Sequence, residues 1–182
     1  MGDIIRHKCF ISYHHDDKDE VISFVNDFDK PRRLFMHREA GIMERELVTC
    51  QDDEVIIRGM RGKYLLDTRV TIVLLGKNTW ARKHVDWEIA ATLREVVVYG
   101  CSGLLAINLP SVANRVSLPP RLQDNLAGER WNEGYARWHP YPENKIHLAD
   151  WIEDAWEART HRAQLINNTR PLRKRDAPIK DE

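Results

Sequence analysis

The chain has 182 residues, a length typical of one domain, and its 28 lysine and arginine residues are balanced by 28 aspartate and glutamate residues. A net charge of zero argues against a nucleic-acid or membrane-surface partner, because such proteins usually carry a basic excess. With 42% hydrophobic residues and no apolar run near the roughly 20 residues that cross a bilayer, the composition excludes a disordered chain and a transmembrane helix. The amino terminus resembles no signal peptide, and Cys9, Cys50 and Cys101 fit no zinc-binding spacing, so we expect a cytoplasmic protein with reduced thiols.

Three short apolar runs predict the strands of a buried sheet. They occupy residues 9–13, 70–75 and 104–109, and glycine or proline lies next to the last two. These last two are apolar at nearly every position, which is typical of parallel strands covered by helices on both faces. Two weaker patterns, at residues 47–49 and 137–141, indicate further strands, the second at an edge of the sheet.

Helical patterns fall between and after these strands. Apolar residues recur at helical spacing over residues 17–29, 85–98 and 145–165, and more weakly over residues 53–66, where two glycines dilute the pattern. A strand, a helix of about 12 residues and a second strand form one parallel crossover unit. The prolines within residues 111–144 instead indicate a long, irregular connection.

These elements predict an α/β protein with an open, mainly parallel sheet of about five strands and helices on both faces. We expect a single domain over residues 1–165. Residues 166–182 combine mixed charges with Pro171 and Pro178 and show no regular period, so we expect a mobile C-terminal tail there.

Polar and aromatic side chains follow the predicted strands at the edge where ligands bind in open parallel sheets. Tyr13 and His14 follow the first strand, Thr79 and Trp80 follow the second, and Asn108 lies at the end of the third. A structural role is the alternative for each: a solvated loop for His14, packing for Trp80 and a strand-end turn for Asn108. This edge is nevertheless richer in chemically active groups than a turn requires.

Glu88 lies near the start of the helix that follows the second strand, beside the same edge. The helix dipole alone also favours an acidic residue near a helix start, so position by itself leaves a structural role open. Lys77, Arg82 and Lys83 crowd the loop before this helix. They offer local cations for a small anionic ligand, such as a pyrophosphate, within a protein of zero net charge.

Several motifs that would identify other chemistries are absent from the sequence. There is no G-x-G-x-x-G after the first strand and no G-x-x-x-x-G-K-[ST], which argues against Rossmann dehydrogenases and P-loop NTPases. No G-x-S-x-G elbow supports a serine hydrolase. The run His14-His15-Asp16-Asp17 points to a metal site only weakly, because adjacent residues rarely chelate one ion well and no H-E-x-x-H motif or cysteine pair accompanies it.

Three segments together resemble the TIR-domain family. The run F-I-S-Y at residues 10–13 is similar to the first sequence box of that family. The run T-I-V-L-L-G-K-N-T-W at residues 71–80, followed by V-D-W-E-I at residues 85–89, resembles its central strand, loop and glutamate-bearing helix. Within that family, the segments resemble the prokaryotic TIR-like group of the Thoeris antiphage defence system. The resemblance extends over residues 7–110 and is loose over residues 111–165.

The resemblance implies a flavodoxin-like fold and, as in many members, cleavage of the nicotinamide–ribose bond of NAD. NAD would then be a substrate, with no cofactor or metal. The catalytic glutamate of the family corresponds to Glu88, and His84 stands where many relatives carry tryptophan four residues earlier. We expect substrate contacts from a set of residues at the sheet edge and on the glutamate-bearing helix: Phe10, Ser12, Tyr13, His14, Thr79, Trp80, His84, Trp87 and Asn108. A satisfied buried hydroxyl is the alternative role for Ser12, and packing is the alternative for Trp87.

One carboxylate suffices for this chemistry on physical grounds. Cleavage of a ribosyl C–N bond passes through an oxocarbenium-like state, and nicotinamide leaves from a cationic nitrogen without needing a proton. A carboxylate near the ribose stabilises the positive charge as it develops. We therefore expect an ADP-ribose-derived product, linear, cyclic or conjugated. The resemblance implies that this product activates a separate effector protein during phage infection.

Two other functions remain open from the sequence. TIR domains also act as non-enzymatic scaffolds through self-association. His84 in place of tryptophan leaves this role open, and a homo-oligomer is consistent with it. A flavodoxin-like fold that binds another nucleotide or a phosphate is a third, weaker hypothesis.

Overall fold

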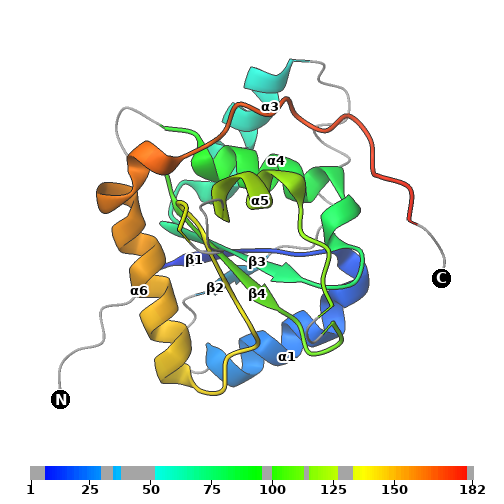
Figure 1. Ribbon diagram of the computed structural model, residues 1–182, viewed down its shortest axis with the longest axis vertical. Helices are drawn as coiled ribbons and strands as arrows, with labels where there is room; N and C mark the ends of the chain where they lie inside the picture. The colour runs from blue at the N-terminus through cyan, green and yellow to red at the C-terminus, as the bar shows by residue number, and fades with distance from the viewer. Residues whose placement is uncertain are drawn as a thin grey trace.

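The computed structural model describes six segments of the chain, residues 7–29, 35–37, 52–95, 100–112, 115–126 and 133–179. The described residues form one sheet of five parallel strands in the order β2-β1-β3-β4-β5. The strands are β1 (Cys9–Ser12), β2 (Phe35–His37), β3 (Val70–Leu75), β4 (Gly103–Asn108) and β5 (Arg137–His139). This order is that of flavodoxin-like folds, so the predicted fold class is confirmed (Figure 1).

The three main strand predictions are confirmed to within one residue, and β5 confirms the predicted edge strand. Strand β2 lies between the first helix and residues 47–49, where we had predicted the strand of this part of the chain. The strand predicted at residues 47–49 falls outside the described residues.

The helices are α1 (Lys18–Phe28), α3 (Asp53–Met60, continued by a π-helical turn over Arg61–Leu65), α4 (Lys83–Leu93), α5 (Pro120–Leu126) and α6 (Lys145–His161). Short 3-10 turns precede α1 (His15–Asp17), precede α4 (Thr79–Ala81) and follow α6 (Ala163–Leu165). Side-chain caps define two starts: Asp52 accepts a hydrogen bond from the amide of Glu54, and Asn144 accepts from the amide of Ile146.

Two helix predictions need correction. Helix α4 ends at Leu93, five residues before the predicted end, because Arg94 has extended backbone angles of φ −70° and ψ 123°. Helix α5 lies inside the stretch that we expected to be irregular. Its first residue is Pro120, and proline at the first helical position starts a helix because its fixed φ fits and its missing amide is not needed there.

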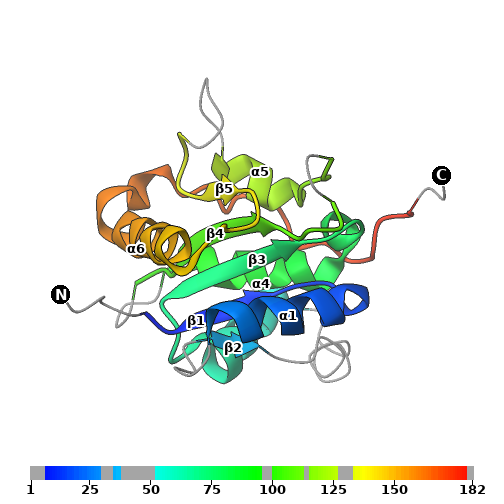
Figure 2. The ribbon, with the colours of Figure 1, turned by 90° about the horizontal axis from the view of Figure 1, so that it is seen from below.

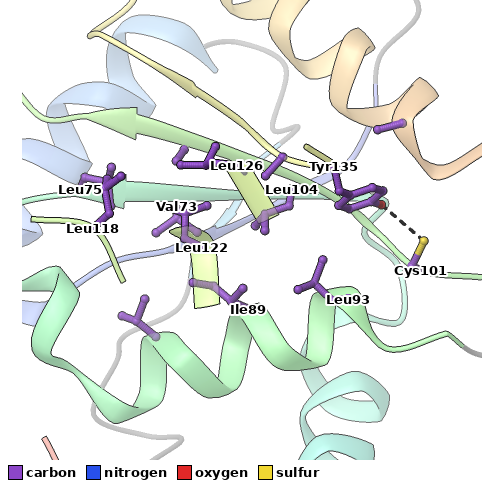
Figure 3. Close-up of a cluster of buried hydrophobic side chains, with 14 residues drawn as sticks. Val73, Leu75, Ile89, Leu93, Cys101, Leu104, Leu118, Leu122, Leu126 and Tyr135 are labelled. Atoms are coloured by element: carbon purple, nitrogen blue, oxygen red, sulfur yellow. Dashed lines mark hydrogen bonds between the residues drawn. The ribbon is translucent and has the colours of Figure 1, made fainter. Parts of the chain in front are cut away.

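Helices cover both faces of the sheet. Helices α1 and α6 lie on one face, and α3, α4 and α5 lie on the other (Figures 1 and 2). Alternation along β1 sends Cys9 and Ile11 to the α1 and α6 side, whereas Phe10 packs toward α3 and α4. Figure 3 shows the cluster between the sheet and α4, where Ile89 meets Val73. This packing fixes α4, and every side chain on it, relative to the ends of the strands.

The C-terminal segment differs from the predicted mobile tail. Residues 166–177 run along α4 and α5 (Figure 1). Leu172 is buried in a hydrophobic cluster with Trp87. Asn125 of α5 donates to the backbone oxygen of Asn167 and accepts from its amide. The segment has no period because side chains of the domain, rather than a helix or a strand, satisfy its backbone groups.

The two cysteines within the described residues, Cys9 and Cys101, are free and buried. Burial raises the pKa of the Cys9 thiol well above its usual range, so Cys9 is an unreactive core residue. Across the described part of the chain, no helix combines the length and the hydropathy needed to cross a membrane.

Candidate active site

Glu88 lies in the second turn of α4 and faces the C-terminal end of β1. It is only 4% exposed, and Ser12, the last residue of β1, donates a hydrogen bond from Oγ to its Oε2. Burial raises the pKa of Glu88 to about 8, and the hydrogen bond from Ser12 lowers it only in part. Glu88 therefore holds a proton in most molecules at neutral pH. A buried carboxyl with a raised pKa beside a ligand-binding sheet edge is a candidate catalytic group.

Two histidines lie on or next to the elements that carry Glu88 and Ser12. His84 lies one helical turn before Glu88, is buried, and places Nε2 3.3 Å from the backbone oxygen of Tyr13. His14 follows Ser12 by two residues on an extended backbone and is fully buried. Its ring centroid lies 6.4 Å from that of His84. We refer to Ser12, His14, His84 and Glu88 as the glutamate cluster.

Arg82 determines the state of His14. Its Nε donates a hydrogen bond of 2.8 Å to His14 Nε2, so the ring carries its proton on Nδ1. Burial, and then the charge of Arg82, lower the pKa of His14 to about 4, which keeps the ring neutral although Asp16 Oδ2 lies 3.1 Å from the same nitrogen. Within the described residues, His14 Nδ1 is one of two buried side-chain nitrogen atoms without a hydrogen-bond partner.

A group of potential cation ligands overlaps this cluster. Donor atoms of His14, His15 and Asp16 lie within 4.8 Å of one another. The Arg82 guanidinium already occupies the Nε2 lone pair of His14 and places a positive charge beside it. The arrangement therefore disfavours a bound cation at these three residues.

Thr79 joins the loops that follow β1 and β3. Its Oγ1 accepts from the amide of Gly76 at 2.9 Å and donates to Asp17 Oδ2 at 3.2 Å. A Cβ on Gly76 would lie 2.1 Å from that same carboxylate oxygen, so a larger residue at this position would displace the Asp17 side chain. Burial raises the pKa of Asp17 to about 6, against the hydrogen bond from Thr79. Thr79 thus shapes the edge of the sheet, and its hydroxyl is already engaged.

An open pocket of about 480 Å³ lies farther along the same edge. Trp80 and Trp138 contribute their indole rings to its lining, together with Val116, Ser117, Leu118, Pro120 and Gln123. Trp138 Nε1 donates to Asn108 Oδ1 at 2.7 Å, which holds the ring in place. None of the lining residues that the structure describes is charged, so the pocket suits a flat, uncharged ring.

A family model described as "Thoeris protein ThsB, TIR-like domain" matches residues 10–114, more than half of the chain. The chain belongs to this family. No individual curated protein matches it. The matched range of the TIR-like domain contains the whole glutamate cluster, whereas α5, β5, α6 and the C-terminal segment follow it.

Two of the expected substrate contacts of the TIR-like domain are packing residues instead. Trp87 packs with Phe10 and Leu172 in a hydrophobic cluster, and its Nε1 donates to the backbone oxygen of Arg173. Successive helix residues differ by about 100°, so the neighbour of Glu88 faces α3 and the C-terminal segment rather than the sheet edge. Phe10 is 1% exposed within the same cluster.

Tyr13 is also placed differently from the prediction. It is buried in the cluster on the α1 and α6 side, among residues such as Ile11, because strand alternation turns it away from Ser12. Its backbone oxygen still meets His84, as described above. Ser12 donates to Glu88, and His84 lies one turn before Glu88 with the His14 ring beside it. Trp80 lines the pocket described above, which we call the aromatic pocket, and Asn108 holds Trp138 there.

Sequence reasoning missed two features of the TIR-like domain. Trp138 belongs to the edge strand that we predicted, but only the pairing of β5 with β4 brings it beside Asn108. The second feature is the ion pair of Arg121 with Asp86 of α4, in which Arg121 Nε lies 2.9 Å from Asp86 Oδ1 and both residues are buried. It anchors the helix of Glu88 to α5, and no local sequence signal marks a pair 35 residues apart.

Proposed function

We propose that this TIR-like protein cleaves the nicotinamide–ribose bond of NAD, with Glu88 as the catalytic carboxylate. One observation carries the proposal: a buried carboxyl at the ligand-binding edge of the sheet, hydrogen-bonded to Ser12 and with its pKa raised to about 8. Membership of the ThsB TIR-like family supports it.

The burial of Glu88 suits the proposed chemistry. A carboxylate in a poorly solvated site stabilises an adjacent oxocarbenium-like centre more strongly than it would in water. The nicotinamide ring of NAD is itself cationic, and a nearby cation lowers the pKa of a carboxyl. Binding of the substrate therefore favours the ionised form of Glu88 that the reaction needs. The neutral His14 avoids adding a positive charge at the same place.

The aromatic pocket offers a place for the other base of NAD. Trp80 and Trp138 provide faces on which a purine can stack, and Gln123 and Ser117 provide polar groups for its edge. NAD would thus lie along the sheet edge, with its nicotinamide ribose at Glu88 and its adenine toward the pocket. The enzyme needs no cofactor or metal in this scheme.

Family membership extends the proposal to the product. We infer that the protein acts in Thoeris antiphage defence in the cytoplasm, and that it makes an ADP-ribose-derived signal for a separate effector protein. Restricted access of water to Glu88 favours capture of the ribosyl centre by another nucleophile, which gives a cyclic or conjugated product.

The test is nicotinamide release from NAD by the purified full chain and by protein recovered from phage-infected cells, with products identified by mass spectrometry. We expect Glu88→Gln to lower release at least about a hundredfold, because it removes the charge that stabilises the transition state. Glu54→Gln is the matched control, since Glu54 lies exposed on α3 and pairs with Arg94. Equal release by wild type and Glu88→Gln would show that Glu88 is not catalytic.

A non-enzymatic scaffold is the second candidate function. The feature that favours it is His84, which is buried at the position where many relatives carry tryptophan. Light scattering together with the shift of Tm on adding NAD separates the two. Concentration-dependent self-association with no effect of NAD would favour the scaffold.

A further inference from the structure

We propose that residues 173–177 form an inhibitory strap that holds the start of α4 and thereby keeps the glutamate cluster closed. The proposal rests on the proposed NAD cleavage and concerns the regulation of that same site. In Figure 1 the strap is the red segment that passes α4 before the C-terminus.

The strap makes several polar contacts with α4 and the turn before it. The amide of Arg173 donates to Asp86 Oδ2 at 2.9 Å, and the amide of Ala177 donates to the oxygen of Ala81 at 2.7 Å. Between them, Asp176 accepts from the amide of Lys83 at 2.8 Å and lies 2.9 Å from a guanidinium nitrogen of Arg82. These contacts lie along the first residues of α4 and the end of the turn before it.

Asp176 supplies a cap that α4 lacks. Arg82 is the N-cap residue of α4, and its side chain makes no capping hydrogen bond within the described residues. The Asp176 carboxylate takes that role from a distant part of the sequence, at the positive end of the helix dipole. Burial acts to raise the pKa of Asp176, but the amide of Lys83 and the charge of Arg82 outweigh it and hold the pKa below its usual range.

Arg82 connects the strap to the glutamate cluster. One guanidinium nitrogen contacts Asp176, and Nε donates to His14, whose ring lies beside His84. Arg82 is also one of the cations expected to meet a substrate pyrophosphate, and here Asp176 engages it. A guanidinium nitrogen of Arg173 further donates to the backbone oxygen of Trp80 at 3.1 Å, so the strap also holds the turn that carries this indole to the aromatic pocket.

The strap is attached in a way that permits release. Its contacts are polar, and those of Asp176 lie near the surface, with the Asp176 side chain 37% exposed. The residues just before it are anchored more firmly, because Leu172 is buried and Arg121 donates to the backbone oxygen of Pro171. Residues 173–177 can therefore detach while the preceding segment stays on the domain. The strap also lies outside the range that the family model matches.

The test compares Asp176→Ala with wild type in the full chain by two measurements. Hydrogen–deuterium exchange reports on the amides of residues 81–86 and 174–177, and nicotinamide release from NAD reports on the site. We expect exchange to become roughly fivefold faster, the effect of losing a helix cap, and nicotinamide release to increase several-fold. Asp124→Ala is the matched control: Asp124 pairs with Arg170 and ties the same segment to α5, away from α4, so neither measurement should change.

Each of the other outcomes contradicts one part of the proposal. Unchanged exchange in Asp176→Ala would show that Asp176 does not hold α4, and the proposed strap would be wrong. Faster exchange with nicotinamide release at the wild-type level would remove the inhibitory role. Faster exchange with no release by any variant would overturn the proposed NAD cleavage, and the inhibitory role with it. The exchange measurement thus separates failure of the strap from failure of the proposed function.

Discussion

Replacing Glu88 by glutamine should stabilise the folded protein, increasingly so as the pH rises. Glutamine keeps the shape of the side chain and an oxygen that accepts the hydrogen bond from Ser12, but it cannot ionise. The pKa of Glu88 is about 8 in the folded protein against an ordinary value of 4.5. Between these values the folded protein holds a proton that the unfolded chain has lost.

The sign and the size follow from this proton. The contribution of Glu88 to stability is fully present below about pH 4.5 and is lost as the pH rises to about 8. At about 1.4 kcal/mol per pH unit, the free energy of unfolding falls by roughly 3 kcal/mol at pH 7 and by about 4 to 5 kcal/mol above pH 8. Glu88→Gln removes this loss. For a domain of this size, Tm should then rise by about 10 °C at pH 8.5.

Urea unfolding of wild type and Glu88→Gln between pH 5 and 8.5 measures this effect. His14 also titrates, since burial lowers its pKa to about 4, so the difference between the two proteins isolates Glu88. Glu54→Gln, which removes an exposed carboxylate, should change stability by less than about 1 kcal/mol at every pH. Parallel stability curves for wild type and Glu88→Gln would refute burial as the cause of the raised pKa.

Three further predictions concern activity and packing. Nicotinamide release should rise with pH and level off above about 8 as Glu88 ionises. Ser12→Ala should move this rise to higher pH, because it removes the hydrogen bond that lowers the pKa of Glu88. A pH profile that is the same in Ser12→Ala and wild type would contradict the prediction. Trp138→Leu should raise KM for NAD about tenfold and leave kcat within a few-fold, whereas a loss confined to kcat would place the adenine elsewhere. Arg121→Met should lower the free energy of unfolding in urea by roughly 3 to 5 kcal/mol, because the Asp86 carboxylate loses its buried partner; a loss under about 1 kcal/mol would mean that water or the Arg173 amide compensates.

The candidate site was predictable where neighbours in sequence are neighbours in space. Glu88 and His84 lie one turn apart on one helix, and Ser12 and His14 share one side of an extended segment, so periodicity places each pair. The direction in which a side chain points was harder to predict. Trp87 and Tyr13 adjoin the site in sequence, yet the turn of a helix and the alternation of a strand direct both into the core.

By itself, the sequence determined the α/β class, the main strands, the helix that carries Glu88 and the family resemblance, because local apolar periods and short motifs encode them. Only the tertiary structure decided that the C-terminal segment lies on α4, that Arg82 links Asp176 to His14, and that Trp138 meets Asn108. These contacts join residues that are distant in the chain. They depend on where strand pairing and helix packing bring backbone and charge together, and no local pattern of residues records that placement.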